Sequence, residues 1–210
     1  FLGKKYAVLS NESSANETYV DGKNVNHQYS KSTEFERDFR EYCKDAFSDC
    51  TEYFSLLRPL SEWQIAREFV KYPRYFPVFQ SCNLGGKTDI WCCNCAKCLY
   101  VYILLAAFLD DSALFGIFGC DMLQKTELSD MFDGLMLDGE DKPFECVGTK
   151  NEVRLALAMA LEKRRVSPPP LLKRFAEKFP DYKPAELSGF FDRDNFVPEK
   201  FLPYVEMTAL

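Results

Sequence analysis

This chain has few histidines and tryptophans, and it has no excess of positive charge. Its 210 residues include one His and two Trp, and 32 Asp and Glu residues outnumber 26 Lys and Arg residues. The resulting net charge of −6 disfavours a general binder of nucleic acids or acidic membranes, because phosphate contacts need clustered Lys and Arg. We therefore expect neither a nucleic-acid partner nor a membrane partner.

Long hydrophobic runs and targeting signals are also missing. The longest apolar run, Leu99 to Leu109, is far shorter than the roughly 20 residues that cross a bilayer. Residues 1–5 lack the basic region, apolar core and cleavage site of a signal peptide. We therefore predict a soluble, cytoplasmic protein. Because the chain does not begin with Met and opens almost directly on a strand-like run, we also expect a fragment of a longer protein.

Cysteine, in contrast, is abundant and clustered. Five of the nine cysteines lie between residues 82 and 98, and four of them follow a C-x9-C-x2-C-x2-C spacing: Cys82, Cys92, Cys95 and Cys98. Thiolates this close repel one another unless they are protonated, oxidised or bound to a soft cation, most commonly tetrahedral zinc. The crowding and the odd total favour a metal site in a reducing compartment over a disulfide framework.

The spacing favours a structural zinc ion over an iron–sulfur cluster, because ferredoxin-type runs add a further Cys followed by Pro. Steps of three residues drift around a helix axis, so the segment must be a turn, with a helix starting near Ala96 and Cys98 in its first turn. A closed four-sulfur site leaves no position for water and has no catalytic role. Cys93 either replaces a ligand or is a surplus thiol, and we interpret the remaining four as buried thiols: Cys43, Cys50, Cys120 and Cys146.

The remaining sequence predicts a mostly helical chain with a few strands. Residues 5–10 form a predicted buried strand, and residues 11–31 a polar loop in the position where open α/β sheets bind ligands. An apolar helix from Cys98 to about Leu109 lacks a polar face, which predicts burial. Residues 123–136 are also predicted to be helical. After the stiff connector at residues 167–170, we expect one short helix and a tail that lies over the body.

Three capping boxes mark predicted helix starts: Thr33 with Glu36, Ser61 with Gln64, and Thr149 with Glu152. Within the polar loop, residues 11–17 and 26–32 are dense in amide, hydroxyl and carboxylate groups. This composition before a helix N-terminus suits an anionic ligand, with Lys31 adding charge and free backbone N–H groups pointing outward. The residues alone leave a plainer interpretation open, in which His27 is a surface residue and residues 30–33 are only an N-cap.

Four segments together resemble a known family. They read NESSANE, VNHQYSKSTEFE, SCN…WCCNCAKC and FECVGTKNEV. From Tyr6 to about Leu161 the chain resembles the C-terminal half of the bacterial UDP-N-acetylmuramoyl-L-alanyl-L-glutamate epimerase, which inverts the terminal glutamate of a peptidoglycan precursor. Through its cysteine site it is also similar to the zinc-bearing synthases of the PP-loop ATP pyrophosphatase superfamily that make 7-cyanodeazaguanine.

The resemblance implies a helix-rich α/β fold: a partial adenine-nucleotide α-hydrolase-like (HUP) sheet with a zinc-bound, four-cysteine helical region. Residues 1–166 would be the C-terminal part of an ATP-pyrophosphatase-like domain that includes the zinc region 82–98, and residues 167–210 a Pro-rich connector with a helical tail. ATP would be split to AMP and pyrophosphate with Mg²⁺. Adenylation of the substrate carboxylate would make the adjacent Cα–H acidic enough for a base to remove. The implied partner is the UDP-linked peptidoglycan precursor.

The resemblance also implies roles for residues of the polar loop. Asn11 and Glu12 would contact the nucleotide or Mg²⁺, and His27 is the first candidate for moving the α-proton. Glu12 or Glu34 would be the second base of an inversion. Lys31 would take a phosphate or carboxylate. The remaining candidates for binding nucleotide or substrate are Ser14, Asn16, Asn26, Gln28 and Ser30, of which Asn26 and Gln28 would orient substrate amides. Gly148 and Thr149 would form either a second anion site or a plain N-cap.

Some features depart from the family pattern. The superfamily's phosphate loop, of the type Ser-Gly-Gly-x-Asp-Ser, does not occur in these 210 residues, and the nearest sequence is Gly85-Gly86-Lys87. If that loop lies elsewhere, we expect this chain alone not to hydrolyse ATP. Family members often carry a basic residue, Gly and Pro where Ser13, Cys93 and Ala96 stand here. Two alternatives stay open: another PP-loop-type adenylating enzyme acting on a carboxylate or nucleobase, and a non-catalytic zinc-stabilised binding module.

Overall fold

The computed structural model describes residues 4–17, 26–47, 51–184 and 187–210. The chain divides into two compact units. Unit 1 comprises residues 1–65 and 186–210, and unit 2 comprises residues 66–185. The predicted boundary after residue 166 refers to a family domain rather than to a compact unit, and it stays a prediction.

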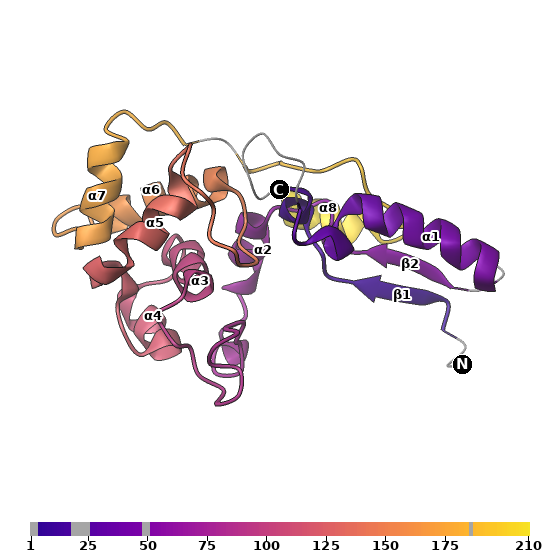
Figure 1. The fold of residues 1–210 in the computed structure, drawn as a ribbon, viewed down its shortest axis with the longest axis horizontal. Helices are drawn as coiled ribbons and strands as arrows, with labels where there is room; N and C mark the ends of the chain where they lie inside the picture. Colours follow the sequence, from indigo (N-terminus) through magenta and orange to yellow (C-terminus); the bar gives the residue numbers. More distant parts are fainter. Residues whose placement is uncertain (1–3, 18–25, 48–50, 185–186) are drawn as a thin grey trace. The chain divides into compact units, whose positions relative to one another are not determined.

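Unit 1 contains two parallel strands, β1 (Tyr6–Leu9) and β2 (Glu52–Ser55), with Tyr6 opposite Glu52 and Leu9 opposite Ser55. Parallel strands need a crossover connection, and helix α1 (Thr33–Phe47) supplies it, running along the sheet in Figure 1. The Phe39 ring packs 4.7 Å from the Tyr53 ring, which fixes α1 on β2. Two short 3₁₀ helices, η1 (Ser13–Asn16) and η2 (Tyr29–Lys31), lie between β1 and α1.

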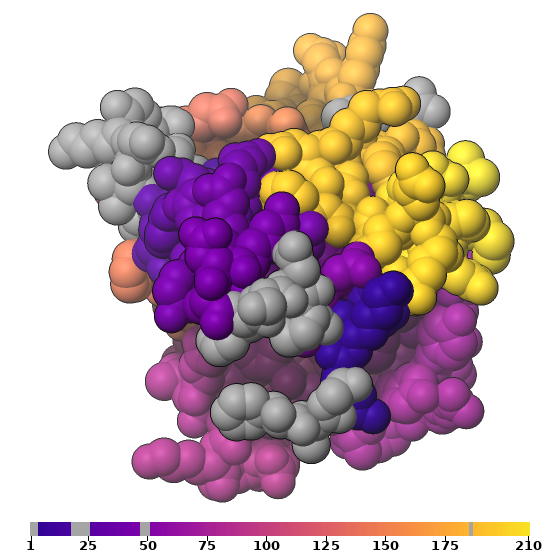
Figure 2. Space-filling model, turned by 90° about the vertical axis from the view of Figure 1, so that its right-hand side faces the viewer, coloured from indigo at the N-terminus to yellow at the C-terminus, as the bar shows by residue number. Residues whose placement is uncertain are grey.

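The C-terminal segment completes the core of unit 1. Buried Phe54 and Leu60 pack with Val197, Val205 and Ala209, the last two from helix α8 (Leu202–Ala209). In Figure 2 this segment, in yellow, lies beside the purple α1 region on one face. The predicted packing of the tail over the body is therefore confirmed within unit 1.

Helix α2 (Glu62–Phe69) begins at a capping box, as predicted. The Ser61 N–H donates to Gln64 Oε1 at 3.0 Å, and the Gln64 N–H donates to Ser61 Oγ at 3.2 Å. The Gln64 side chain also ties down the tail, because its Nε2 donates to the carbonyl oxygens of Phe190 at 2.9 Å and Ala209 at 3.0 Å.

Unit 2 is helical in its described residues and is built around α3 (Ala96–Ala106), which packs against α4 (Asp111–Phe118), α5 (Ser129–Met136) and α6 (Lys150–Lys163). Every residue of α3 except Lys97 is buried, which confirms the prediction of an apolar, enclosed helix. The remaining elements are short: η3 (Pro73–Tyr75), η4 (Met122–Gln124), η5 (Thr126–Leu128) and α7 (Pro170–Lys178).

Helix α6 starts at the predicted capping box. The Thr149 hydroxyl accepts from the Glu152 N–H at 3.1 Å, and the Glu152 carboxylate accepts from the Thr149 N–H at 2.8 Å. Since these two donors already have partners, the structure supports the plain N-cap at Gly148 and Thr149 rather than a second anion site.

These elements make a helix-rich α/β protein, as predicted, with a small parallel sheet of two strands in its described residues. The finer assignment to an adenine-nucleotide α-hydrolase-like fold stays a prediction. Across the described ranges, none of the helices combines the length and the apolar character needed to cross a bilayer.

Candidate functional site

Four cysteine sulfur atoms converge in unit 2. The Sγ atoms of Cys82, Cys92, Cys95 and Cys98 all lie within 4.8 Å of one another. Zinc–sulfur bonds of about 2.3 Å place the sulfur atoms of a tetrahedral site roughly 3.8 Å apart, so this set fits one zinc ion after a small contraction. The predicted turn before α3 is also present, with Cys95 as the helix N-cap and Cys98 in the first turn.

Backbone geometry prepares these sulfur atoms for negative charge. The Gly85 N–H donates to Cys82 Sγ at 3.2 Å, and the Cys98 N–H donates to Cys95 Sγ at 3.4 Å. Glycine is required at 85, because a Cβ there would overlap the carbonyl oxygen of Ile90. The turn that brings Cys82 back to the cluster therefore depends on a residue without a side chain.

The thiols of the cluster share their protons unequally. The hydrogen bond from the Cys98 thiol lowers the pKa of Cys95 to about 5, whereas the Cys95 thiolate raises the pKa of Cys98 above its usual range. Against the opposing effect of burial, backbone N–H bonds also lower the pKa of Cys82, whereas burial raises the pKa of Cys92. The protein alone thus favours thiolates at two positions and opposes them at the other two. A dication removes this opposition, because it attracts every thiolate in the set.

Cys93 does not belong to the cluster. Its backbone is left-handed, with a φ of 50°, and its buried Sγ donates to the Phe118 carbonyl oxygen at 3.2 Å. Burial, followed by the nearby Cys120 thiol, raises the pKa of Cys93 to about 12. The structure therefore supports the surplus-thiol interpretation, and the left-handed backbone suits the Gly that we expect in family members.

The expected burial of the other cysteines is wrong where the structure describes them. The side chains of Cys43, Cys120 and Cys146 are half-buried rather than enclosed. Cys50 lies outside the described residues.

The second candidate site is the polar loop of unit 1, at the carboxyl ends of its two strands. Asn11 follows β1, and its Nδ2 donates at 3.2 Å to the hydroxyl of Ser55, the last residue of β2. The two polar constellations, residues 11–17 and 26–32, meet beyond this point. Asn26 Nδ2 donates to the Ala15 carbonyl oxygen at 2.8 Å, which joins residues 26–32 to residues 11–17.

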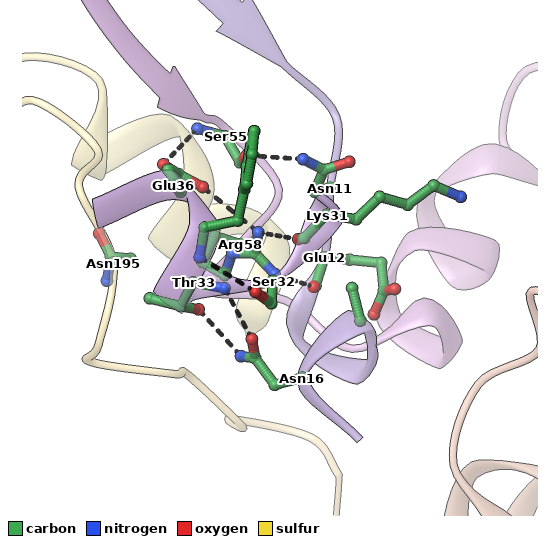
Figure 3. Close-up of polar contacts among 12 residues, drawn as sticks. Asn11, Glu12, Asn16, Lys31, Ser32, Thr33, Glu36, Ser55, Arg58 and Asn195 are labelled. Carbon is green, nitrogen blue, oxygen red and sulfur yellow. Dashed lines mark hydrogen bonds and ion pairs between the residues drawn. The ribbon is translucent and has the colours of Figure 1, made fainter. Parts of the chain in front are cut away.

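Asn16 joins residues 11–17 to the first residue of α1. Its Nδ2 donates to Thr33 Oγ1 at 2.9 Å, and its Oδ1 accepts from the Thr33 N–H at 2.8 Å (Figure 3). The amide of Asn16 is thus engaged with the start of α1. Asn26 is also engaged at both ends of its amide, since its Oδ1 accepts from the Gln28 N–H at 2.7 Å.

Glu12 caps η1 with both carboxylate oxygens. One accepts from the Ser14 N–H at 2.5 Å and the other from the Ser14 hydroxyl at 2.9 Å, and Ser14 is buried. The candidates on the second segment are more open to solvent. Lys31 Nζ donates to Gln28 Oε1 at 3.4 Å, and four candidate side chains are exposed: His27, Ser30, Lys31 and Glu34.

Helix α1 does not begin with the predicted Thr33–Glu36 capping box. Ser32 is the N-cap, because its Oγ accepts from the Phe35 N–H at 3.1 Å. The prediction that the first N–H groups point outward is also wrong for two residues. The Thr33 N–H donates to Asn16, and the Phe35 N–H donates to Ser32. The Glu36 carboxylate turns inward instead, where Oε1 accepts from the Ser55 N–H at 2.8 Å.

Sequence analysis missed Arg58, which is fully buried and lies between Glu12, Lys31 and Glu36 (Figure 3). Its guanidinium donates to the Glu12 carbonyl oxygen at 2.7 Å, to the Lys31 carbonyl oxygen, and to Glu36 Oε2 at 3.3 Å. One signal was present: the run FSLLRPL places a single arginine inside an otherwise apolar stretch. An arginine there indicates a buried polar partner, since unpaired charges are rarely enclosed.

The structure is that of a helix-rich α/β protein with two candidate sites. The candidate ligand site is the polar loop at the carboxyl edge of the parallel strand pair. The candidate metal centre is the set of four converging thiols in the helical unit. Two family models match the chain: the MurL N-terminal domain over residues 1–56 and the MurL C-terminal domain over residues 78–188. The chain belongs to the MurL family.

Curated relatives carry the name UDP-N-acetyl-alpha-D-muramoyl-L-alanyl-L-glutamate epimerase. The protein from Xanthomonas oryzae pv. oryzae is 38% identical over 181 residues, covering 82% of this chain and 40% of the relative. That from Salinispora tropica is 36% identical over 205 residues, covering 92% of this chain and 45% of the relative. The chain thus spans less than half the length of these relatives. No solved structure matches it significantly.

Proposed function

We propose that this protein epimerises the terminal L-glutamate of UDP-N-acetylmuramoyl-L-alanyl-L-glutamate during peptidoglycan precursor synthesis. The observation that carries the proposal is the similarity to epimerases of that name, at 36–38% identity over 82–92% of this chain. By the same resemblance the reaction uses ATP and Mg²⁺, proceeds by carboxylate adenylation and α-proton transfer, and takes place in the cytoplasm.

Carboxylate activation explains why such an enzyme needs ATP. A carboxylate anion resists further negative charge on its α-carbon, whereas an activated acyl group is neutral and can delocalise that charge. Inversion then needs a base on one face of the α-carbon and an acid on the other. His27 is our candidate for one of these roles, because imidazole exchanges a proton near neutral pH and this side chain is exposed.

The geometry favours Glu34 over Glu12 as the second acid–base group. Both carboxylate oxygens of Glu12 accept from Ser14, which makes Glu12 a capping residue of η1. Glu34 is exposed in the first turn of α1, on the segment that follows His27 and Lys31. Exposed Lys31 is the candidate for binding a substrate carboxylate or phosphate.

The described residues do not by themselves fit a triphosphate. Two N–H donors at the start of α1, those of Thr33 and Phe35, already bind protein oxygen atoms, and the chain contains no Ser-Gly-Gly loop. The proposed use of ATP and Mg²⁺ therefore rests on the resemblance to the epimerase family. The thiol cluster, by contrast, fits zinc, which would hold the turn before α3 and offer no open position for catalysis.

The test compares wild-type protein with His27→Ala in the full-length gene product. Epimerisation is followed by chiral analysis of the glutamate released from the UDP-linked precursor, and adenylation by AMP and pyrophosphate release. We expect His27→Ala to lose epimerisation by about 10²–10⁴-fold, the usual contribution of a general acid–base group, while adenylation persists. Glu41→Ala, an exposed change on the same helix as Glu34, serves as the control and should leave both rates unchanged.

The other outcomes identify the alternatives. Full epimerase activity with Ala at 27 removes His27 from the mechanism. Wild-type protein that adenylates a carboxylate or nucleobase without inverting glutamate is a different adenylating enzyme. A protein that turns over no substrate and still binds zinc is a binding module.

A further inference from the structure

We infer that Arg58 is a positioning residue, whose buried guanidinium holds the two polar constellations of the candidate site in one fixed arrangement. The inference rests on the proposed function of that site. Arg58 itself is 0% exposed, so it cannot touch substrate and must act through the backbone that it binds.

The contacts of Arg58 join segments that are distant in sequence. One terminal nitrogen binds the carbonyl oxygen of Glu12, directly before η1, and the other binds that of Lys31, at the end of η2. In Figure 3 these carbonyl groups face Arg58, while the side chain of Lys31 extends away from it. Arg58 thus fixes the backbone from which the candidate side chains project.

Glu36 completes the arrangement by joining Arg58 to β2. Its Oε2 pairs with Arg58 at 3.3 Å, and its Oε1 accepts from the Ser55 N–H at 2.8 Å, so one carboxylate links the guanidinium to β2. Both side chains are almost fully enclosed, at 0% and 2% exposure. Buried ion pairs of this kind contribute little net stability, because desolvation offsets their attraction. Their value lies in geometry, since removing either partner leaves a buried charge without its counterpart.

Only arginine can make these contacts together. Its planar guanidinium presents several donors in a rigid fork, whereas the lysine ammonium is a compact point charge on a flexible stem. The Arg58 Nε has no hydrogen-bond partner within the described part of the chain. An enclosed donor left unsatisfied is unfavourable, so the position keeps arginine for its two terminal nitrogens.

The decisive variant is Arg58→Lys, which keeps the charge and removes the fork. The matched control is Arg154→Lys in unit 2, where another largely buried arginine donates to the Met136 carbonyl oxygen and pairs with Asp138. Both variants are assayed in the full-length gene product, at a temperature where circular dichroism shows them fully folded. If a residue matters only for folding, its substitution leaves kcat and KM unchanged in protein that is fully folded.

We expect Arg58→Lys to raise KM for the UDP-linked precursor and to lower kcat, reducing kcat/KM by about 10–100-fold, because reacting groups displaced by about 1 Å lose alignment. Arg154→Lys should stay within about twofold of wild type. Equal kinetic constants for the two variants overturn the inference. A wild-type protein without epimerase activity contradicts the proposed function instead.

Hydrogen exchange tests the same inference independently of turnover. In Arg58→Lys the N–H groups of Ser14, Thr33 and Phe35 should exchange at least about tenfold faster, because their acceptors lie on the released segments. Wild-type exchange rates at these three positions overturn the inference whatever the activity.

If Arg58→Lys does not fold, Glu36→Gln decides. It keeps the shape of the side chain and removes the negative charge that pairs with the Arg58 guanidinium, which weakens the hold of Arg58 on the two segments. We then expect a severalfold loss in kcat/KM and faster exchange of the Thr33 N–H, and wild-type behaviour in both overturns the inference.

Discussion

Cys93 and Cys95 stand two positions apart, yet their sulfur atoms have different surroundings. Cys95 accepts an N–H bond from Cys98 inside the four-sulfur set, whereas Cys93 donates to the carbonyl oxygen of Phe118. Cys93 has a left-handed backbone, and its sulfur atom is not part of the four-sulfur set. Thiols two positions apart therefore differ in their capacity to bind an ion.

This difference predicts the metal content of two serine variants. Cys95→Ser should lower bound zinc from about one ion per chain to a small fraction of that, because a hydroxyl is a poor replacement for a thiolate ligand. Cys93→Ser should keep about one ion. Elemental analysis of protein purified without added metal measures both, and equal zinc in the two variants contradicts the four-cysteine assignment.

The two candidate sites differ in how much of their geometry can be predicted from sequence. The thiol cluster is local, since a turn of a few residues and the first turn of a helix bring three ligands together. Arg58 binds a carbonyl group 46 positions away and a carboxylate 22 positions away. Such contacts depend on strand pairing and on the crossover helix, so spacing alone does not reveal them.

At the scale of elements, capping boxes were predicted correctly where no stronger interaction competed for their residues. Those at Ser61 and Thr149 are present, while that at Thr33 is not. Glu36 has the predicted spacing but pairs with buried Arg58, and Ser32 caps the helix instead. A tertiary charge contact therefore overrides a local motif of about 1 kcal/mol.

Strand β2 and helix α4 were missed for physical reasons. Strand β2 is stabilised by pairing with β1, whose residue Tyr6 lies opposite Glu52, so its main partner is far away in sequence. Helix α4 has no clear apolar face, because Phe115 is 62% exposed although it lies among apolar residues. Neither feature leaves a periodic pattern in the chain.

Glycine substitutions test the packing at the start of α6. A Cβ at Gly148 would overlap the hydroxyl of Tyr100 and lie 2.8 Å from Glu152 Oε2, and both neighbours are buried. Gly148→Ala should therefore lower the free energy of unfolding by about 1–3 kcal/mol through overpacking. Gly116→Ala is the matched control in α4, with nothing within 4 Å, and should raise it by about 0.5–1 kcal/mol.

Urea unfolding of the two alanine variants, followed by circular dichroism, measures these changes. The loss of glycine flexibility in the unfolded chain is the same in both, so only the folded surroundings differ. Changes of the same sign would show that Gly148 is not confined as the structure indicates.

At the scale of the whole molecule, the chain is two compact units with different construction. Unit 1 combines residues from both ends of the chain around a parallel strand pair, whereas unit 2 is one continuous segment. The candidate metal centre belongs entirely to unit 2 and the polar loop entirely to unit 1.

This division predicts where metal removal acts. After treatment with a strong chelator, amides of residues 82–106 should exchange hydrogen at least about tenfold faster, because four uncompensated thiols no longer hold the turn. Amides of β1 and β2 should keep their rates, and added zinc should restore the slow exchange in unit 2. Unchanged exchange at residues 82–106 after the zinc has been removed argues against a structural role for the ion.

The closure of unit 1 by its C-terminal segment has a consequence for biosynthesis. Phe54 and Leu60 are translated before their partners Val197, Val205 and Ala209, which follow only after the intervening residues 66–185. At about 5–20 residues per second, those 120 or so residues delay completion of the core by roughly ten seconds. During that interval the rings of Tyr6 and Phe54 lack their later partner Phe201, and transiently exposed hydrophobic surface of this kind is prone to aggregation.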